Sequence, residues 1–192
     1  MALMGPNGAG KTTLLQTLAG QLNHSGTLEQ GPTAFLGARP PEPVDMQAVE
    51  LVRAHGAEDP QAWLDRVGYE GPELVSRGSA GERALVGLAG ALSRARDLLL
   101  DEPFGPLDPP HTARVWPRLA DHAEDHAVLL ATHDPTVAAR ADRVVLLAGT
   151  IVAQGPPREV LAEEPLSDCY GAPVDVAWTD LGPVVRGRER SH

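Results

Sequence analysis

The sequence predicts an α/β fold in which a mostly parallel sheet carries an inserted helical segment. Three apolar runs, Leu98–Leu100, Val128–Ala131 and Val144–Leu147, are separated by segments of helical length, which is typical of buried parallel strands. A fourth apolar run, residues 1–4, leads through a glycine-rich loop into leucines at helical spacing. Residues 44–94 have a helical period of their own, so we expect them to form a separate group of helices.

The amino-terminal part is predicted to form a strand, a loop, a helix and two short strands. The helix is indicated by leucines at helical spacing, namely Leu14, Leu15, Leu18 and Leu22. Glycines and a proline then separate two apolar stretches, Thr27–Leu28 and Thr33–Leu36, which we interpret as short strands. Prolines at positions 40, 41 and 43 end this part of the chain.

The middle part carries start signals for helices. Apolar residues recur with a helical period over residues 46–52, and Asp59–Pro60 is a typical helix start. Ser79 and Glu82 have the spacing of a capping box, in which each side chain satisfies a backbone N–H of the first helical turn. We expect this box to open an apolar helix that continues to Leu92.

The last part returns to strands. Asp108 followed by Pro109 and Pro110 predicts the start of a helix between the first two buried strands. Residues 148–153 predict a hairpin turn and strand, and a helix is expected around residues 158–161. The tail from Pro173 alternates weakly and is expected to add strands.

Length and composition fit one domain, residues 1–192. The chain has 42% hydrophobic and 22% charged residues, which is close to the globular average and enough to bury a core. We divide it into an α/β core of residues 1–38 and 95–155, a helical subdomain of residues 44–94, and a tail of residues 156–192.

Charge and cysteine content exclude several classes of function. The net charge of −10 would repel a phosphate backbone, so we expect no nucleic-acid partner. The single cysteine, Cys169, cannot form an internal disulfide, and we expect a free, unreactive thiol. No apolar run approaches the roughly 18 residues that span a bilayer. We therefore expect a cytoplasmic protein that meets the inner face of the cell membrane only through a partner.

The glycine-rich loop matches the pattern GxxxxGK[ST]. Its residues are Gly5, Pro6, Asn7, Gly8, Ala9, Gly10, Lys11, Thr12 and Thr13. In this pattern backbone N–H groups turn inward and cradle phosphates at a helix N-terminus. We expect Lys11 to reach the β- and γ-phosphates of a nucleotide and the Thr12 hydroxyl to hold Mg²⁺. The competing interpretation is an ordinary strand-to-helix turn.

Polar residues follow two of the predicted strands. Asp101 and Glu102 come directly after Leu98–Leu100, and His133 follows Val128–Ala131. Ligands of open α/β sheets bind at such strand ends. Asp101 suits the Mg²⁺ shell, Glu102 can orient or deprotonate an attacking water, and His133 can bond a γ-phosphate oxygen. Taken alone, two such carboxylates more often merely cap a loop, and a single histidine is more often solvated.

The order of these motifs resembles the ATP-binding cassette (ABC) ATPases. Five segments occur in the family's order, over roughly residues 1–170: GPNGAGKTT, GSAGE at 78–82, LLLDEP at 98–103, GPLD at 105–108 and THD at 132–134. The resemblance implies that Ser79 and Gly81 reach the γ-phosphate of ATP held by a second copy of the chain. It also places Asp108 in a loop that communicates between the two sites. Ser79 and Asp108 are at the same time expected helix N-caps.

The sequence departs from the family pattern at three places. GSAGE stands where LSGGQ is usual, and Gly37–Ala38–Arg39 stands where the family has a Gln that touches the metal and the water. The sequence also starts directly on the strand before the glycine loop, without the family's upstream strands or its adenine-stacking aromatic residue. We therefore expect an N-terminally truncated version of the fold. Two explanations stay open, a longer native protein and a real degeneration of the site.

The resemblance implies an ATPase that powers a separate membrane permease, with ATP and Mg²⁺ as cofactors and a homodimer as the working form. Residues 155–161 and 168–171 resemble the tails of cassettes for chelated iron, haem, cobalamin or metal-ion import, in which a substrate-binding protein is a further partner. Two alternatives stay open: the compact haem-exporter cassette of cytochrome c maturation, and a degenerate module that binds nucleotide without hydrolysis.

His122 and His126 could form a metal pair, although a solvated helix end is the favoured interpretation.

Overall fold

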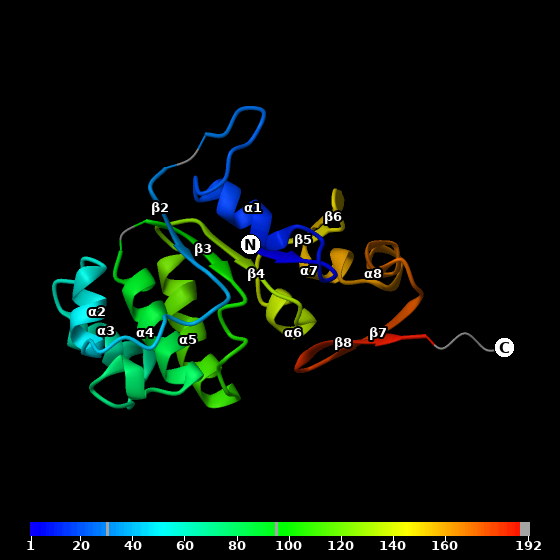
Figure 1. Cartoon of the computed structure of the whole chain (residues 1–192). Helices are drawn as coiled ribbons and strands as arrows, with labels where there is room; N and C mark the ends of the chain where they lie inside the picture. Colours follow the sequence, from blue (N-terminus) through cyan, green and yellow to red (C-terminus); the bar gives the residue numbers. More distant parts are fainter. Residues whose placement is uncertain (30, 95, 189–192) are drawn as a thin grey trace.

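A computed structural model describes residues 1–29, 31–94 and 96–188 (Figure 1). Its centre is a six-stranded sheet in the order β2-β3-β4-β1-β5-β6. The strands are β1 (Ala2–Met4), β2 (Thr33–Leu36), β3 (Asp97–Asp101), β4 (Val128–Ala131), β5 (Val144–Leu147) and β6 (Ile151–Gly155). All neighbouring pairs are parallel except β5 and β6, which form the expected antiparallel hairpin. The α/β fold class with a mostly parallel sheet is confirmed.

The central strands are apolar throughout because both faces of the sheet are covered. Successive side chains of a strand point to opposite faces. In β3, Leu98 and Leu100 therefore join one core cluster, while Leu99 joins the other. β5 divides in the same way, with Val145 and Leu147 on the side of Leu99. This double burial explains why the sequence shows continuous apolar runs instead of alternation.

Helices cover the two faces unequally. One face is covered by α1 (Lys11–Leu18), whose buried Leu15 packs in the smaller cluster with Leu99. The larger cluster lies on the opposite face. Its helices are α2 (Ala48–Ala54), α3 (Pro60–Val67), α4 (Ala80–Leu92), α5 (Pro109–His122), α6 (Pro135–Ala138), α7 (Pro157–Val160) and α8 (Glu163–Tyr170). Helices α2 to α5 gather at one side of the molecule, and α7 and α8 lie at the other (Figure 1).

The predicted helix starts are confirmed. The Asp59 side chain accepts from the Ala62 N–H at the start of α3, and the capping box of Ser79 and Glu82 is complete at the start of α4. Asp108 accepts from the His111 N–H and is followed by proline in the first turn of α5. Helices α2 to α4 lie between β2 and β3 in the chain, where the sequence predicts the helical insertion. The exact domain bounds stay a prediction, and residues 95 and 189–192 of those bounds lie outside the described residues.

Two expectations need correction, and one helix was missed. Thr27–Leu28 is not a strand, because the sheet ends at β2 and offers this segment no neighbour to pair with. Leu22 does not continue the first helix, which ends at Leu18 and leaves Leu22 41% exposed. Helix α8 was not expected, although two glutamates in its first turn and Gly171 as its C-cap are helix signals.

The tail beyond α8 forms a separate hairpin. Strands β7 (Val174–Thr179) and β8 (Gly182–Gly187) pair with each other in antiparallel fashion, and β8 packs beside α6. This confirms the expected strands in the tail. Among the described residues, we find no helix with the length and apolar character that membrane crossing requires.

Candidate active site

A cavity of about 270 Å³ opens where the glycine loop meets the carboxyl end of β3. The loop runs from β1 into α1, so its backbone lies beside the parallel strands at the edge where ligands of such sheets bind. The cavity is lined by Asn7, Gly8, Ala9, Gly10, Lys11, Thr12, Thr13, Ala38, Asp101 and Glu102. Of the predicted residues, seven loop positions and both carboxylates are therefore brought together in one place.

The shape of the loop depends on glycine at two positions. Gly10 is the N-cap of α1 with a left-handed φ of 96°, a conformation that other residues adopt only at a cost. At Gly5 a Cβ atom would overlap the carbonyl oxygen of Leu147, because the loop passes directly against the end of β5. The Lys11 ammonium donates to the carbonyls of Gly5 at 2.8 Å and Pro6 at 3.0 Å. The positive charge is thus held over the loop's own concave side.

Thr12 and Asp101 meet although 89 residues separate them in the chain. The Thr12 Oγ1 donates to the Asp101 Oδ2 at 2.7 Å. Asp101 is the last residue of β3 and is only 3% exposed, so its carboxylate is removed from water on most sides. A hydroxyl and a carboxylate in contact form an all-oxygen pair, which is the donor type that Mg²⁺ prefers. The residues present therefore fit that ion.

Glu102 and His133 form the second polar pair. The His133 Nδ1 lies 3.0 Å from the Glu102 Oε1, and the Glu102 side chain is 24% exposed whereas that of His133 is 71% exposed. Glu102 is the one non-glycine residue with positive φ, 48°, among the described residues. Such a backbone conformation costs about 1–2 kcal/mol in an L-residue and persists only where the surroundings hold it. Its N–H donates to the Ala131 carbonyl at 2.9 Å, which fixes the residue beside β4.

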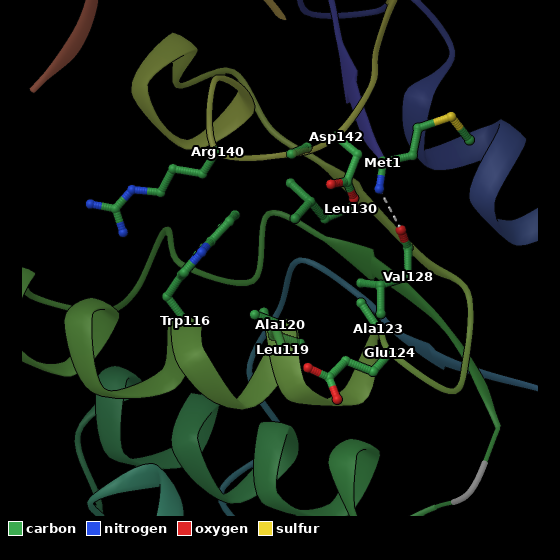
Figure 2. Close-up of a pocket in the computed structure, with 11 residues that line it drawn as sticks. Met1, Trp116, Leu119, Ala120, Ala123, Glu124, Val128, Leu130, Arg140 and Asp142 are labelled. Atoms are coloured by element: carbon green, nitrogen blue, oxygen red, sulfur yellow. Dashed lines mark hydrogen bonds between the residues drawn. The ribbon is translucent and has the colours of Figure 1, made fainter. Parts of the chain in front are cut away.

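The indole of Trp116 is contacted by a residue of the loop after Glu102 and by a residue that follows α6. Phe104, two positions after Glu102, stacks against Trp116 of α5 with ring centroids 5.5 Å apart. The guanidinium of Arg140, which follows α6, lies 5.4 Å from the centre of the same indole. Figure 2 shows Trp116 and Arg140 at one end of a second cavity, which lies between α5 and the starts of β1 and β4. None of the predicted site residues lines this second cavity.

The cavity beside the glycine loop is not lined by Ser79, Gly81 or Asp108. Ser79 caps α4, and its backbone N–H, donating to Glu82, holds the pKa of that carboxyl below its ordinary value. A Cβ at Gly81 would come within 3.0 Å of the Pro106 carbonyl, so α4 begins directly against the loop after Glu102. The His111 backbone N–H and side chain likewise lower the pKa of Asp108. In a single chain these residues thus act as helix caps and spacers.

Two contributors were not among the predicted site residues. Ala38 lines the cavity, within the segment Gly37–Ala38–Arg39 where the resemblance expects a glutamine. Arg83 donates to the carbonyls of Pro41 and Gly78 and ties the start of α4 to the chain that follows β2. The position of Ala38 follows from its place just after β2. That of Arg83 has no signal in the sequence pattern.

The remaining candidates stay outside the site. His122 ends α5, and its ring stacks on that of His126 with centroids 4.8 Å apart. Within residues 1–29, 31–94 and 96–188, no group of three or more His, Cys, Asp or Glu side chains is arranged to hold a metal ion. Cys169 is buried, and burial raises the pKa of its thiol, which fits the expected unreactive cysteine.

Comparison with known proteins places the chain in a family. A family model described as ABC transporter matches residues 1–105. The hemin import ATP-binding protein of Rhodococcus jostii is 36% identical, over 92% of this chain and 72% of that protein. The protein of the same name from Burkholderia ambifaria is 34% identical, over 94% of this chain and 86% of its own length.

Solved structures agree on the fold. A metal-chelate type ABC transporter in an inward-facing conformation superposes with a TM-score of 0.77 at 24% identity, covering 98% of this chain and 86% of that one. An ATP-binding subunit of an ABC transporter superposes with a TM-score of 0.69 at 22% identity, covering 83% and 79%. The chain belongs to the ABC transporter family, as one of its ATP-binding, ATP-hydrolysing subunits.

Proposed function

We propose that the chain hydrolyses ATP at the cavity beside the glycine loop and thereby powers a membrane permease that imports haem or a similar metal chelate. The observation that carries the proposal is the pairing of Thr12 with Asp101 and of Glu102 with His133 around that loop. Each pair joins residues far apart in the chain, and each supplies one function that phosphoryl transfer needs. The names of the relatives support the cargo.

The triphosphate would rest on the backbone N–H groups of the loop from Gly5 to Thr13, apart from Pro6, which has none. Amides at the start of a helix attract anions, because the helix dipole and the unpaired N–H groups both favour negative charge. Lys11 already holds its ammonium over the loop through the carbonyls of Gly5 and Pro6. We infer that this ammonium exchanges those carbonyls for β- and γ-phosphate oxygens when ATP enters.

Thr12 and Asp101 are the residues that would hold Mg²⁺. When bound, the ion neutralises the charge that develops on the phosphate oxygens. The chain's contribution is to keep the Thr12 hydroxyl and the nearly buried Asp101 carboxylate in contact, at 2.7 Å. Holding both ligands in place before the ion arrives reduces the ordering that binding requires.

Glu102 is our candidate for the group that accepts a proton from the attacking water. It lines the cavity, its strained backbone fixes its direction, and His133 contacts its Oε1. The exposed imidazole of His133 is then free on its other nitrogen to bond a γ-phosphate oxygen, so it would position both the base and the phosphate. A positioned base of this kind contributes roughly 10²–10⁴ in rate.

Ser79, Gly81 and Asp108 are assigned to a second copy of the chain. None of the three lines the cavity in one chain, which fits a role across a homodimer, in which the start of α4 faces the γ-phosphate held by the partner. The permease would hold the dimer at the inner face of the cell membrane, and a substrate-binding protein would deliver the cargo. Import is preferred over the exporter alternative because the relatives are named for import.

The catalytic part is tested by replacing Glu102 with glutamine. We expect steady-state ATP hydrolysis by the purified chain to fall by about 100-fold or more, because the amide cannot accept a proton. Nucleotide binding, measured by calorimetry with Mg²⁺, should stay within a few-fold of wild type. Glu42→Gln, at an exposed carboxylate away from the cavity, is the matched control. Equal rates for Glu102→Gln and wild type would remove Glu102 from catalysis.

The cargo is tested separately. We expect the gene to restore haem uptake in a bacterium whose haem importer lacks only its ATP-binding subunit, when the permease of this chain's own organism is supplied. Restoration by wild type and loss with Glu102→Gln would support haem import. No uptake of haem, together with normal hydrolysis, would leave the ATPase assignment intact and refute the cargo.

A further inference from the structure

A third cavity, of about 380 Å³, lies between α3, α4 and α5. It shares no lining residue with the cavity beside the glycine loop. Six residues line this α3–α5 cavity: Trp63, Arg66, Leu92, Arg118, Asp121 and His122. Leu92 at the end of α4 is buried, whereas the charged side chains come from α3 and α5. The proposed function uses none of these residues.

The lining has a net positive charge, whereas the chain as a whole has a net negative charge. Two arginines and one aspartate line the cavity, before any charge on His122 is counted, while the whole chain has a net charge of −10. The general field of the protein therefore repels anions. Binding of an anion here would rest on the local groups alone, within a distance of about one Debye length, roughly 8–10 Å at ordinary salt.

Arg66 is held in place without a carboxylate. Its guanidinium lies 4.5 Å from the centre of the Trp63 ring, which is a favourable cation–π distance. Among the residues that the structure describes, it takes part in no ion pair with an acidic side chain. The indole thus fixes the guanidinium, and its hydrogen-bond donors stay available to an oxyanion.

Arg118 and His122 add donors from α5. Arg118 pairs with Asp121 at 3.2 Å, but both side chains are well exposed, at 44% and 65%, and such surface pairs are worth only about 0–1 kcal/mol. An anion can therefore compete for Arg118. His122 is bonded through Nε2 to the Arg96 carbonyl at 2.8 Å, which leaves Nδ1 as the ring atom for a ligand.

We propose that the α3–α5 cavity binds a phosphoryl group, as inorganic phosphate or as the phosphate of a small phosphorylated molecule. Two guanidinium forks on different helices match a tetrahedral anion with several oxygens better than a single carboxylate, which one fork satisfies. The Nδ1 of His122 accepts from a phosphate oxygen that carries a proton. A volume of about 380 Å³ leaves room for more than the phosphate itself.

The test uses the indole N–H signals of the three tryptophans, Trp63, Trp116 and Trp178, in proton–nitrogen NMR spectra. Trp63→Phe identifies the signal of interest. The full-length chain is first saturated with a Mg²⁺-bound non-hydrolysable ATP analogue, so that added phosphate does not enter the glycine loop. Inorganic phosphate and glycerol phosphate are then titrated in parallel at constant ionic strength, with chloride as the reference anion.

We expect a saturable shift of the Trp63 signal and no shift of the Trp116 signal. Arg66→Gln and Arg118→Gln should each weaken binding by about tenfold or more, since each removes a charge-assisted bond. Arg53→Gln, at an exposed arginine of α2 outside the cavity, should titrate like wild type. Tighter binding of glycerol phosphate than of phosphate would identify a phosphorylated metabolite as the ligand, and the reverse would identify free phosphate.

Three results would overturn the proposal: a Trp63 shift that chloride reproduces, a shift that does not saturate, or both arginine variants titrating like wild type. Dispersed spectra of the variants exclude unfolding as the cause of lost binding. Because the readout is the Trp63 signal, failure of nucleotide binding at the glycine loop would appear as a separate result.

Discussion

Replacing Thr12 with valine removes one hydroxyl and keeps the shape of the side chain. In the native protein this hydroxyl donates to the Asp101 Oδ2 at 2.7 Å, and Asp101 is 3% exposed. The variant leaves a buried carboxylate oxygen without that donor. A hydrogen bond to a charged group contributes about 1.5–3 kcal/mol to stability, and a buried acceptor that loses its partner costs a similar amount.

We therefore expect Thr12→Val to lower the free energy of unfolding by about 1.5–3 kcal/mol. For a chain of this length each kcal/mol shifts the melting temperature by about 2–4 °C, so Tm should fall by between about 3 and 12 °C. The measurement is denaturant and thermal unfolding without nucleotide or Mg²⁺, so that only the protein's own contact is tested.

Thr13→Val is the matched control. Thr13 is the next residue of the same helix, is exposed, and its hydroxyl makes no hydrogen bond to the described part of the chain. It should change stability by less than about 0.5 kcal/mol. A cycle with Asp101→Asn gives the coupling between the two side chains. If Thr12→Val and Thr13→Val unfold alike, the contact contributes nothing and the assignment of a preformed Thr12–Asp101 pair is wrong.

Three further substitutions test other parts of the site. Gly5→Ala forces a Cβ against the Leu147 carbonyl, so the rate of ATP hydrolysis should fall by about 10²-fold as the loop shifts. Gly187→Ala, where a Cβ meets open space, should leave that rate unchanged. Ala38→Gln adds an amide to the cavity wall and should raise the hydrolysis rate several-fold; no increase in kcat would show that the side chain at this position is not what limits the reaction. Glu82→Ala should lower the free energy of unfolding by about 0.5–2 kcal/mol at neutral pH, because it removes one half of the capping box. Since the folded pKa of Glu82 is below its ordinary value, the advantage of wild type should be lost as the pH falls through that folded pKa, and a pH-independent difference in unfolding would contradict the capping box.

The parts of the fold that the sequence could predict are those governed by short-range rules. The runs around Leu99 and Val145 predicted parallel strands because strands buried on both faces are apolar throughout. Asp59 and Ser79 predicted helix starts because their side chains satisfy the first free N–H groups. Thr27 and Leu28 were misread because β-propensity alone forms no strand without a neighbouring strand to pair with.

The candidate site could be predicted in outline only. The rule that ligands bind at the carboxyl ends of parallel strands brought Asp101 and His133 toward the glycine loop. The contact of Glu102 with His133, and the positive φ of Glu102, depend on the registers of β3 and β4 and on the turns after them. The approach of Leu147 to Gly5 depends on the end of β5. Such packing is set by the whole molecule, and no local pattern records it.

Trp116 also links the loop that carries Glu102 to the segment that follows α6. Its indole is touched by Phe104 from the loop of Glu102 and by Arg140 from the segment that follows His133 and α6. If either segment moves, the Trp116 ring tilts or a gap opens beside it. The other segment then loses part of its contact with the indole. We therefore expect a change at Trp116 to alter the position of both Glu102 and His133, although the described contacts of its indole include neither residue.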